Sequence, residues 1–435
     1  MRRSVCTALI VVSFVTSLSL LLPPPSTAQA PTVITLESLL LAVDRHPSVV
    51  AAARALDAAR ARLIQARAGS AVQVSLNGRA AYGTLAQGTP TGGSATFSHS
   101  VALEASVPVF DGGITALQVA QAESAVEAAQ AALEAARQDV LLAAARAYFQ
   151  ALQTMGLVEV RAAALRFAQK QVEQAEAFFR AGTTARADVI KAQAAAASAE
   201  ADLVAARGQV EIALASLRSA LNLPLTQEIQ VATPREPVIP EVTPTEAAAL
   251  ALSGRPEVRR AAAEVKSAQA ALRIAEIRAG MVVSVDAGLV LQISPNPGQV
   301  GWALSATVSS PLLDGGRAKA AVEEARANLA SAIARMEEIK RQVQLEAFQA
   351  AVNVREARAR LAAVQASVVA AEESLRVAEG RYQAGVGTIL EVLDAQTAAT
   401  QARISHVQAR YDLYLAVVAL QHALGKPVIA QGETT

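Results

Sequence analysis

The sequence predicts an α+β membrane protein that consists of a duplicated unit, each unit with one strand hairpin and one very long coiled-coil helix. A Pro-x-x-Asp-Gly-Gly motif and an Ala-Gly turn both occur twice, with the same spacing between the copies: Asp111 matches Asp314, and Gly182 matches Gly385. Hydrophobic residues make up 52% of the chain but aromatic residues only 3%, so much of the apolar content is alanine. Alanine-rich segments favour long helices that pack at short distance.

The N-terminal residues have the pattern of an export signal. Arg2 and Arg3 precede an apolar stretch, three prolines end it, and small residues follow as a cleavage site. We expect residues 1–30 to be a secretory signal peptide; the alternative is a membrane anchor, for which the stretch is short. The later sequence has no run of about 18 apolar residues, so any membrane-spanning segment is expected to be a strand. With 39 basic and 38 acidic residues, the charge gives no indication of nucleic-acid binding.

The internal repeats divide the rest of the chain. The first repeat is expected at 31–222 and the second at 245–427. A proline-rich linker at 223–244 joins them, and a short C-terminal tail follows at 428–435.

Alternation of apolar and polar residues predicts four strands. They lie near 71–82 and 98–109 in the first repeat, and near 281–293 and 301–310 in the second. Each is about as long as a tilted strand that crosses a bilayer. Four strands cannot close a barrel, so the chain must oligomerise: a dimer would give eight strands and a filled interior, and a trimer twelve strands and a lumen. The alternative is a soluble sheet that caps a helical bundle.

The longest helices are expected at 113–180 and 316–383, each about 100 Å long at about 1.5 Å per residue. Val119, Val126 and Leu133 recur every seven residues, which predicts a coiled coil, and alanines three residues later line its seam. The other expected helices are shorter, and two of them can together cover one long helix. They are return helices at 186–220 and 389–424, and helices at 47–68 and 256–279.

Each strand hairpin is expected to join its long helix through the Pro-x-x-Asp-Gly-Gly motif. Proline removes a hydrogen-bond donor and ends the strand, paired glycines let the chain turn, and aspartate caps the first helical turn. A plain strand-to-helix turn would need the same residues, so the motif alone shows no function. The expected hinge residues are Pro108, Asp111, Gly112, Gly113, Pro311, Asp314, Gly315 and Gly316.

These motifs, duplicated over essentially the whole mature chain, resemble the TolC-like outer-membrane efflux proteins. The resemblance implies a homotrimer in the outer membrane, whose twelve-stranded barrel continues into a helical tunnel across the periplasm. It further implies a passive exit duct for small molecules or proteins, in a tripartite efflux or type I secretion system. The implied partners are outer-membrane lipid, a periplasmic adaptor and an inner-membrane transporter.

The glycines that end the long helices suit the left-handed conformation at a helix C-terminus. The resemblance implies that the two turns form the tip that meets the adaptor. The expected contact residues are Arg180, Gly182, Thr183, Gly385, Val386 and Gly387. The resemblance also implies a barrel lumen, for which the strands offer the polar residues Arg79, Glu104 and Asp286.

Two acids begin the second return helix. Glu391 and Asp394 are three residues apart, so both lie on one helix face. By resemblance they line the narrow periplasmic entrance, where a ring of carboxylates selects cations. Lys191 takes the place of Asp394 in the first unit, so only the second unit is doubly acidic there. The alternative is structural, because Thr388 and Glu391 also match a capping box.

The sequence offers no sign of an enzyme. The four histidines are scattered, and no nucleophile motif, phosphate-binding loop or metal-ligand pair occurs, so we expect no catalytic residue, cofactor or metal. The alternative function is a secreted, alanine-rich coiled-coil scaffold or adaptor of the periplasm. A duct needs no substrate pocket, so the sequence names no exported substrate.

Overall fold

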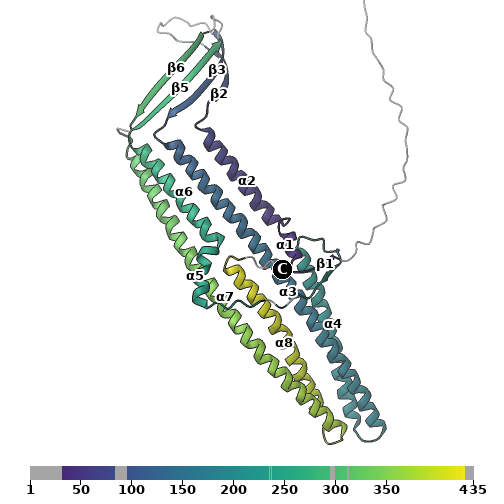
Figure 1. Ribbon diagram of the computed structural model, residues 1–435. Helices are drawn as coiled ribbons and strands as arrows, with labels where there is room; N and C mark the ends of the chain where they lie inside the picture. The colour runs from purple at the N-terminus through teal and green to yellow at the C-terminus, as the bar shows by residue number, and fades with distance from the viewer. Residues whose placement is uncertain are drawn as a thin grey trace, which may run out of the picture.

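The computed structural model describes residues 32–83, 96–234, 236, 238–293, 299–310 and 313–426. They form a long, curved layer of helices with one sheet at its end (Figure 1). The expected signal peptide, the C-terminal tail 428–435 and Pro311 lie outside the described residues.

Six helices form the layer, and every boundary lies within one residue of its expected position. The long helices have 67 residues each, and the return helices 35 each. The helices are α2 (Pro47–Ala68), α3 (Ile114–Arg180), α4 (Arg186–Ala220), α6 (Pro256–Ala279), α7 (Arg317–Gln383) and α8 (Ile389–Ala423).

The helices have a fixed lateral order. In the half that carries the sheet, α2 contacts α3, α3 contacts α6, and α6 contacts α7. In the other half, α4 contacts α3, α3 contacts α8, and α8 contacts α7. The layer therefore has two free edges, one made by α2 and α4 and the other by α7.

Small side chains line the helix contacts. Ala144, Ala145 and Ala151 of α3 are fully buried, as expected for helices that approach closely. The largest side chains gather at mid-height, where Phe149 packs edge-on against Tyr148 and Tyr414, with ring centres 5.3 and 5.6 Å apart. Burial raises the pKa of the Tyr148 hydroxyl to about 12.

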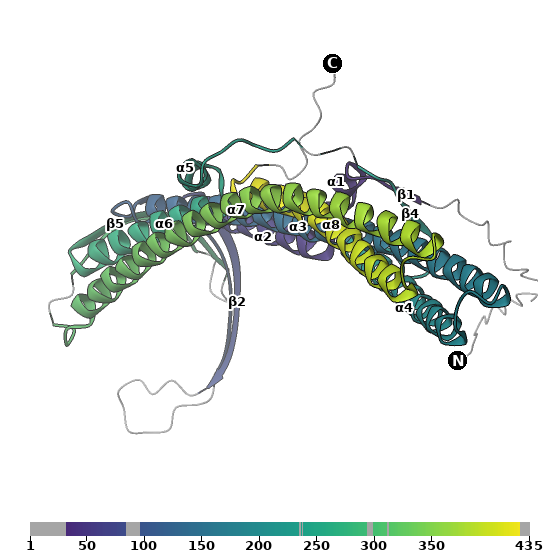
Figure 2. The same ribbon diagram turned by 90° about the horizontal axis from the view of Figure 1, so that it is seen from below.

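Four short elements lie on the convex side of the layer, as Figure 2 shows, and no sequence pattern predicted them. They are β1 (Thr32–Ile34), α1 (Ser38–Val43), β4 (Ile229–Val231) and α5 (Pro244–Gly254). Strands β1 and β4 pair in parallel, so part of the expected linker is a strand. The Tyr148 hydroxyl donates to the Ala232 carbonyl oxygen (2.5 Å), which ties this segment to α3.

The sheet consists of two antiparallel hairpins in the order β2-β3-β5-β6. Strands β3 and β5 join the hairpins, and β2 and β6 each have a neighbour on one side only. The strands are β2 (Gln73–Gly83), β3 (Thr96–Phe110), β5 (Val282–Ile293) and β6 (Gln299–Ser309).

The strand register separates polar from apolar residues. Leu103 pairs with Leu76 on one side and with Leu291 on the other, and such directly opposite residues share a face. Arg79, Glu104 and Asp286 all fall on the opposite face by the same pairing. The apolar face is uncovered: Leu76 is 70% exposed, and Trp302 on the same face 82%.

Candidate functional site

Each strand hairpin meets its long helix in the same geometry. Gly112 and Gly113 have φ of 70° and 86°, which only glycine adopts at low cost, and Gly315 and Gly316 repeat this with 65° and 86°. The Asp111 carboxylate accepts hydrogen bonds from the backbone N–H groups of Gly113 (2.9 Å) and Thr115 (2.6 Å). The joint is thus fixed by aspartate and glycine.

The second joint repeats this capping. The Asp314 carboxylate accepts from the backbone N–H groups of Ala318 (2.7 Å) and Gly316 (2.9 Å). Hydrogen bonds from Ala318 and Gly316 hold the pKa of Asp314 below its usual value, so the cap is ionised at neutral pH.

The expectation that Pro108 ends its strand is wrong. Strand β3 continues to Phe110, with a shift of register against β5 between Pro108 and Phe110. The pairing of β2 with β3 stops at Gln73 and Ser106, so beyond Ser106 one side of β3 has no partner strand. A proline without an N–H donor is tolerated there, and it marks a bulge instead of the strand end.

Both helical hairpins turn through a Schellman motif. In the first, the N–H of Gly182 (φ 75°) donates to the Phe179 carbonyl, and that of Thr183 to Phe178. In the second, Gly385 (φ 75°) and Val386 make the equivalent bonds to Tyr382 and Arg381. Arg180, Thr183 and Val386 are exposed beside these turns.

The two tips touch each other. Phe178 of the first hairpin packs against Tyr382 of the second, with ring centres 5.5 Å apart. A groove of about 560 Å³ lies between the tips, lined by Thr184 and Asp188 on one side and Gly387 and Leu390 on the other. The structure therefore brings together the tip residues of both repeats.

Arg381 lies against the turn of the second tip. Its Nε is 3.5 Å from Glu391 Oε2, and its Nη2 donates to the Val386 carbonyl oxygen at 3.5 Å. A Cβ on Gly387 would lie 3.0 Å from that of Arg381, so the turn packs closely on the arginine. No sequence motif pointed to Arg381.

Glu391 makes only half of a capping box. Its backbone N–H donates to Thr388 Oγ1 (3.3 Å), while its carboxylate accepts from the Thr388 hydroxyl (3.3 Å). By contrast, the Glu246 carboxylate in α5 accepts from the Thr243 backbone N–H (3.0 Å), which completes that box.

Asp394 differs from Glu391 in its surroundings. It is exposed, and its carboxylate makes no hydrogen bond or ion pair with another described residue. It precedes Asp412 by 18 residues, or about five helical turns, so the two carboxylates lie on the same side of α8.

That side of α8 faces the concave surface of the layer. Leu413, Val417 and Leu420 pack in one cluster with residues of α5, which lies on the convex side (Figure 2). A second side of α8 packs against α3 through Tyr414 and its neighbours. The remaining side, which carries Asp412, lines a groove between α3 and α7 that also contains charged side chains.

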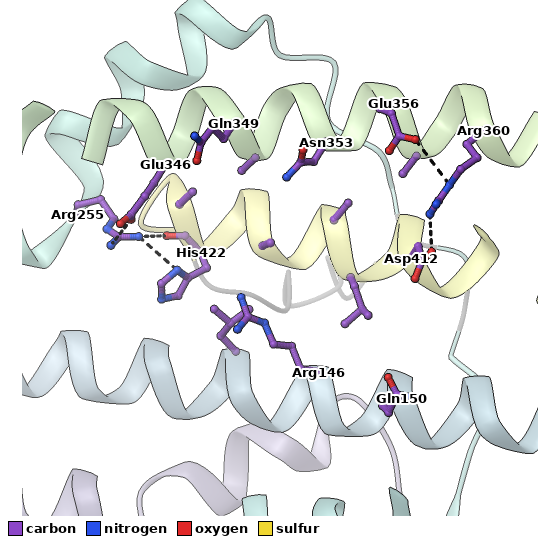
Figure 3. Close-up of a pocket in the computed structure, with 17 residues that line it drawn as sticks. Arg146, Gln150, Arg255, Glu346, Gln349, Asn353, Glu356, Arg360, Asp412 and His422 are labelled. Carbon is purple, nitrogen blue, oxygen red and sulfur yellow. Dashed lines mark hydrogen bonds and ion pairs between the residues drawn. The ribbon is translucent and has the colours of Figure 1, made fainter. Parts of the chain in front are cut away.

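The groove has a volume of about 730 Å³ and an ion-pair network at one end (Figure 3). Arg255 is 7% exposed in its side chain and donates to both carboxylate oxygens of Glu257 (2.8 and 3.0 Å) and to Glu346 (3.2 Å). His422 Nε2 lies 3.1 Å from Asp139 Oδ1, and this hydrogen bond lowers the pKa of Asp139. The network fixes the end of α8 to α3, α6 and α7.

The end of α8 also abuts the end of α5. A Cβ on Gly254 would overlap the Leu424 carbonyl oxygen, which is backbone and cannot rotate away. We expect Gly254→Ala to destabilise the protein by about 2–3 kcal/mol. The melting temperature of the purified variant tests this sign; a value equal to that of the wild type would contradict the contact.

The described residues include no group of three or more histidine, cysteine, aspartate or glutamate side chains placed to hold a metal ion. No described helix is both long and apolar enough to cross a membrane.

The duplicated architecture has a counterpart among known proteins. The sequence model of the family described as Outer membrane efflux protein matches residues 39–223 and 247–426. The chain belongs to this family. The two matched segments correspond to the two repeats, each with one long helix and one return helix. As an outer membrane efflux protein, the chain is a component of the outer membrane.

Individual known proteins agree with this assignment. The outer membrane efflux protein BepC of Brucella suis biovar 1 is 28% identical over 75% of this chain and 72% of its own length. The outer membrane protein TolC of Vibrio cholerae serotype O1 is 24% identical over 70% of this chain and 72% of its own. The crystal structure of VceC, an outer membrane protein of Vibrio cholerae, has the same fold, with a TM-score of 0.80, 24% identity, and coverage of 91% and 97% of the two chains.

Proposed function

We propose that three copies of this chain close into a twelve-stranded barrel in the outer membrane, which continues into a helical tunnel and serves as a passive exit duct. The observation that carries the proposal is the sheet, with one uncovered apolar face and two unpaired edges. Lipid can cover such a face, but it cannot satisfy the free N–H and C=O groups of an open edge. Pairing β2 of one copy with β6 of the next removes both edges.

The helices support the same closure. Strand β2 follows the edge helix α2, and β6 precedes the edge helix α7, so sheet and layer open on the same two sides. Large apolar side chains are exposed along both helical edges, as expected for surfaces that a second copy covers. They are Ile64, Ile190 and Ile212 on α2 and α4, and Ile333, Leu345 and Phe348 on α7.

The duct is proposed to serve efflux. BepC, which carries efflux in its name, aligns over most of this chain. The exposed tips then suit contact with a periplasmic adaptor that belongs to an inner-membrane transporter. A periplasmic scaffold, the alternative left open by the sequence, would expose the apolar face of the sheet to water.

The entrance is proposed to lie at the tips. Asp394 is on the concave side of α8, which faces the axis once three copies close, and Glu391 lies one turn before it. Three copies supply a ring of carboxylates at the narrow end, which favours cations over anions. The pairs of aspartate and glycine, Asp111 with Gly113 and Asp314 with Gly316, act as rigid joints between barrel and tunnel.

The proposal is tested on full-length protein extracted from outer membranes. We expect a detergent-stable trimer that migrates differently after heating, and stable ionic conductance when the trimer is added to planar bilayers. A monomer recovered from the soluble periplasmic fraction, or a trimer that never conducts, would contradict it.

A further inference from the structure

The acids that begin the two return helices have cationic neighbours, with one exception. In the first repeat, Asp188 lies 3.9 Å from Lys191 within the return helix. In the second repeat, Glu391 has Arg381 at 3.5 Å, across the turn. Asp394 alone of these three carboxylates has no cation within ion-pair distance among the described residues.

Lys191 and Arg381 do not occupy corresponding positions in the two repeats. Phe178 occupies the position in the first repeat that Arg381 occupies in the second, and Asp394 occupies that of Lys191. The second repeat therefore has no lysine at this position of the return helix and carries an arginine at the end of the long helix. Arg381, the cation of the second repeat, therefore lies at the turn, whereas Asp394 lies further along the return helix and has no cationic partner.

We propose that Arg381 is a selectivity-determining residue of the entrance, which offsets Glu391 and leaves Asp394 as the net charge. The inference rests on the proposed entrance. From the second return helix and its turn, three copies contribute six carboxylates and three arginines, so these residues carry a net charge of −3 instead of −6, while Asp188 and Lys191 of the first repeat offset each other. The arginine thus limits how strongly cations are concentrated there.

The contacts of Arg381 place its guanidinium beside the turn. Its guanidinium also bonds to the Val386 carbonyl, and Gly387 packs against its backbone and Cβ. The planar, multi-donor guanidinium can bind the carbonyl and the carboxylate together. Arg381 therefore positions the turn as well as balancing Glu391.

The test is the reversal potential of single channels in a salt gradient. Arg381→Gln should raise the cation-to-anion permeability ratio about two- to threefold, because each copy loses one positive charge near the mouth. Arg381→Lys should stay near the wild-type ratio, since it keeps the charge. The double variant Arg381→Gln/Glu391→Gln should return to the wild-type permeability ratio, because it restores the net charge of the mouth.

Arg403→Gln is the matched control. Arg403 pairs with Glu372 at 2.8 Å and lies nine residues from Asp394, about two and a half turns, on the opposite side of α8. Its removal should leave the ratio unchanged. Heat-modifiable migration of each variant shows that the trimer is intact.

The outcomes separate the inference from the proposed entrance. If Asp394→Asn lowers the ratio but Arg381→Gln leaves it unchanged or lowers it, the role of Arg381 is overturned and the entrance stands. If neither variant changes the ratio, the proposed entrance itself is wrong.

Discussion

Leu103→Arg is expected to prevent assembly in the outer membrane, whereas Ala102→Arg, its neighbour on the strand, is expected to be tolerated. Leu103 is the middle residue of β3 and pairs with Leu76 and Leu291 on the apolar face. Ala102 pairs with Asn77 and Gln292 and falls on the polar face. An arginine on the lipid side near the bilayer midplane costs about 2–4 kcal/mol, and a trimer would carry three.

The measurement is the amount of heat-modifiable trimer in the outer-membrane fraction. We expect loss of the trimer for Leu103→Arg, and a level near wild type for Ala102→Arg, with altered conductance because a cation is added to the lumen. If both variants assembled equally well, the apolar face would not be the lipid face. If only Ala102→Arg failed, the sheet would be inverted relative to our assignment.

The long elements could be predicted because each has its own periodic signal. Seven-residue spacing of Val119, Val126 and Leu133 identifies α3, and the alternation that includes Leu103 and Glu104 identifies β3. The glycines Gly182 and Gly385 then fix the turns, since the left-handed conformation is cheap only for glycine. Because the unit is duplicated, each of these patterns occurs twice in the chain.

The short elements had no such signal. Strands of three residues, such as β1 and β4, show no periodicity, and their pairing joins segments that are far apart in the chain. One signal was available for α5, because Thr243 and Glu246 form a complete capping box after a proline-rich stretch. The prolines of that stretch favoured a linker, so the helix that follows it was not predicted.

The candidate site was only partly accessible from sequence for a similar reason. Spacing placed Glu391 and Asp394 on one helix face, but it could not show that Arg381 returns across the turn to Glu391. The same holds for Arg255, whose partner Glu346 lies on α7 and whose neighbour His422 lies at the end of α8. Contacts between segments that are far apart in the chain can be identified only in the folded structure.

Asp394→Asn is expected to weaken block of the channel by Mg²⁺ about tenfold. Asp394 is the acid of the proposed entrance that has no cationic partner, so its charge acts on ions in the mouth without local compensation. In water, a unit charge at about 8 Å attracts a divalent ion by about 1 kcal/mol, and salt reduces this to a fraction. Three lost carboxylates then remove about 1.4 kcal/mol, which corresponds to tenfold in blocking concentration.

Glu372→Gln supplies the control for this prediction. Glu372 is an acid of α7 that pairs with Arg403, on the side of α8 opposite to Asp394. Its removal changes the charge of the tunnel wall by the same amount but away from the axis, so block by Mg²⁺ should stay near wild type. An equal loss of block in both variants would mean that the total charge of the helical barrel, not a ring at the entrance, attracts the ion. Unchanged block in Asp394→Asn and Glu391→Gln would exclude both acids from the entrance. A lower melting temperature of Glu391→Gln would then leave Glu391 with the capping role alone, because it bonds to Thr388 at the first turn of α8.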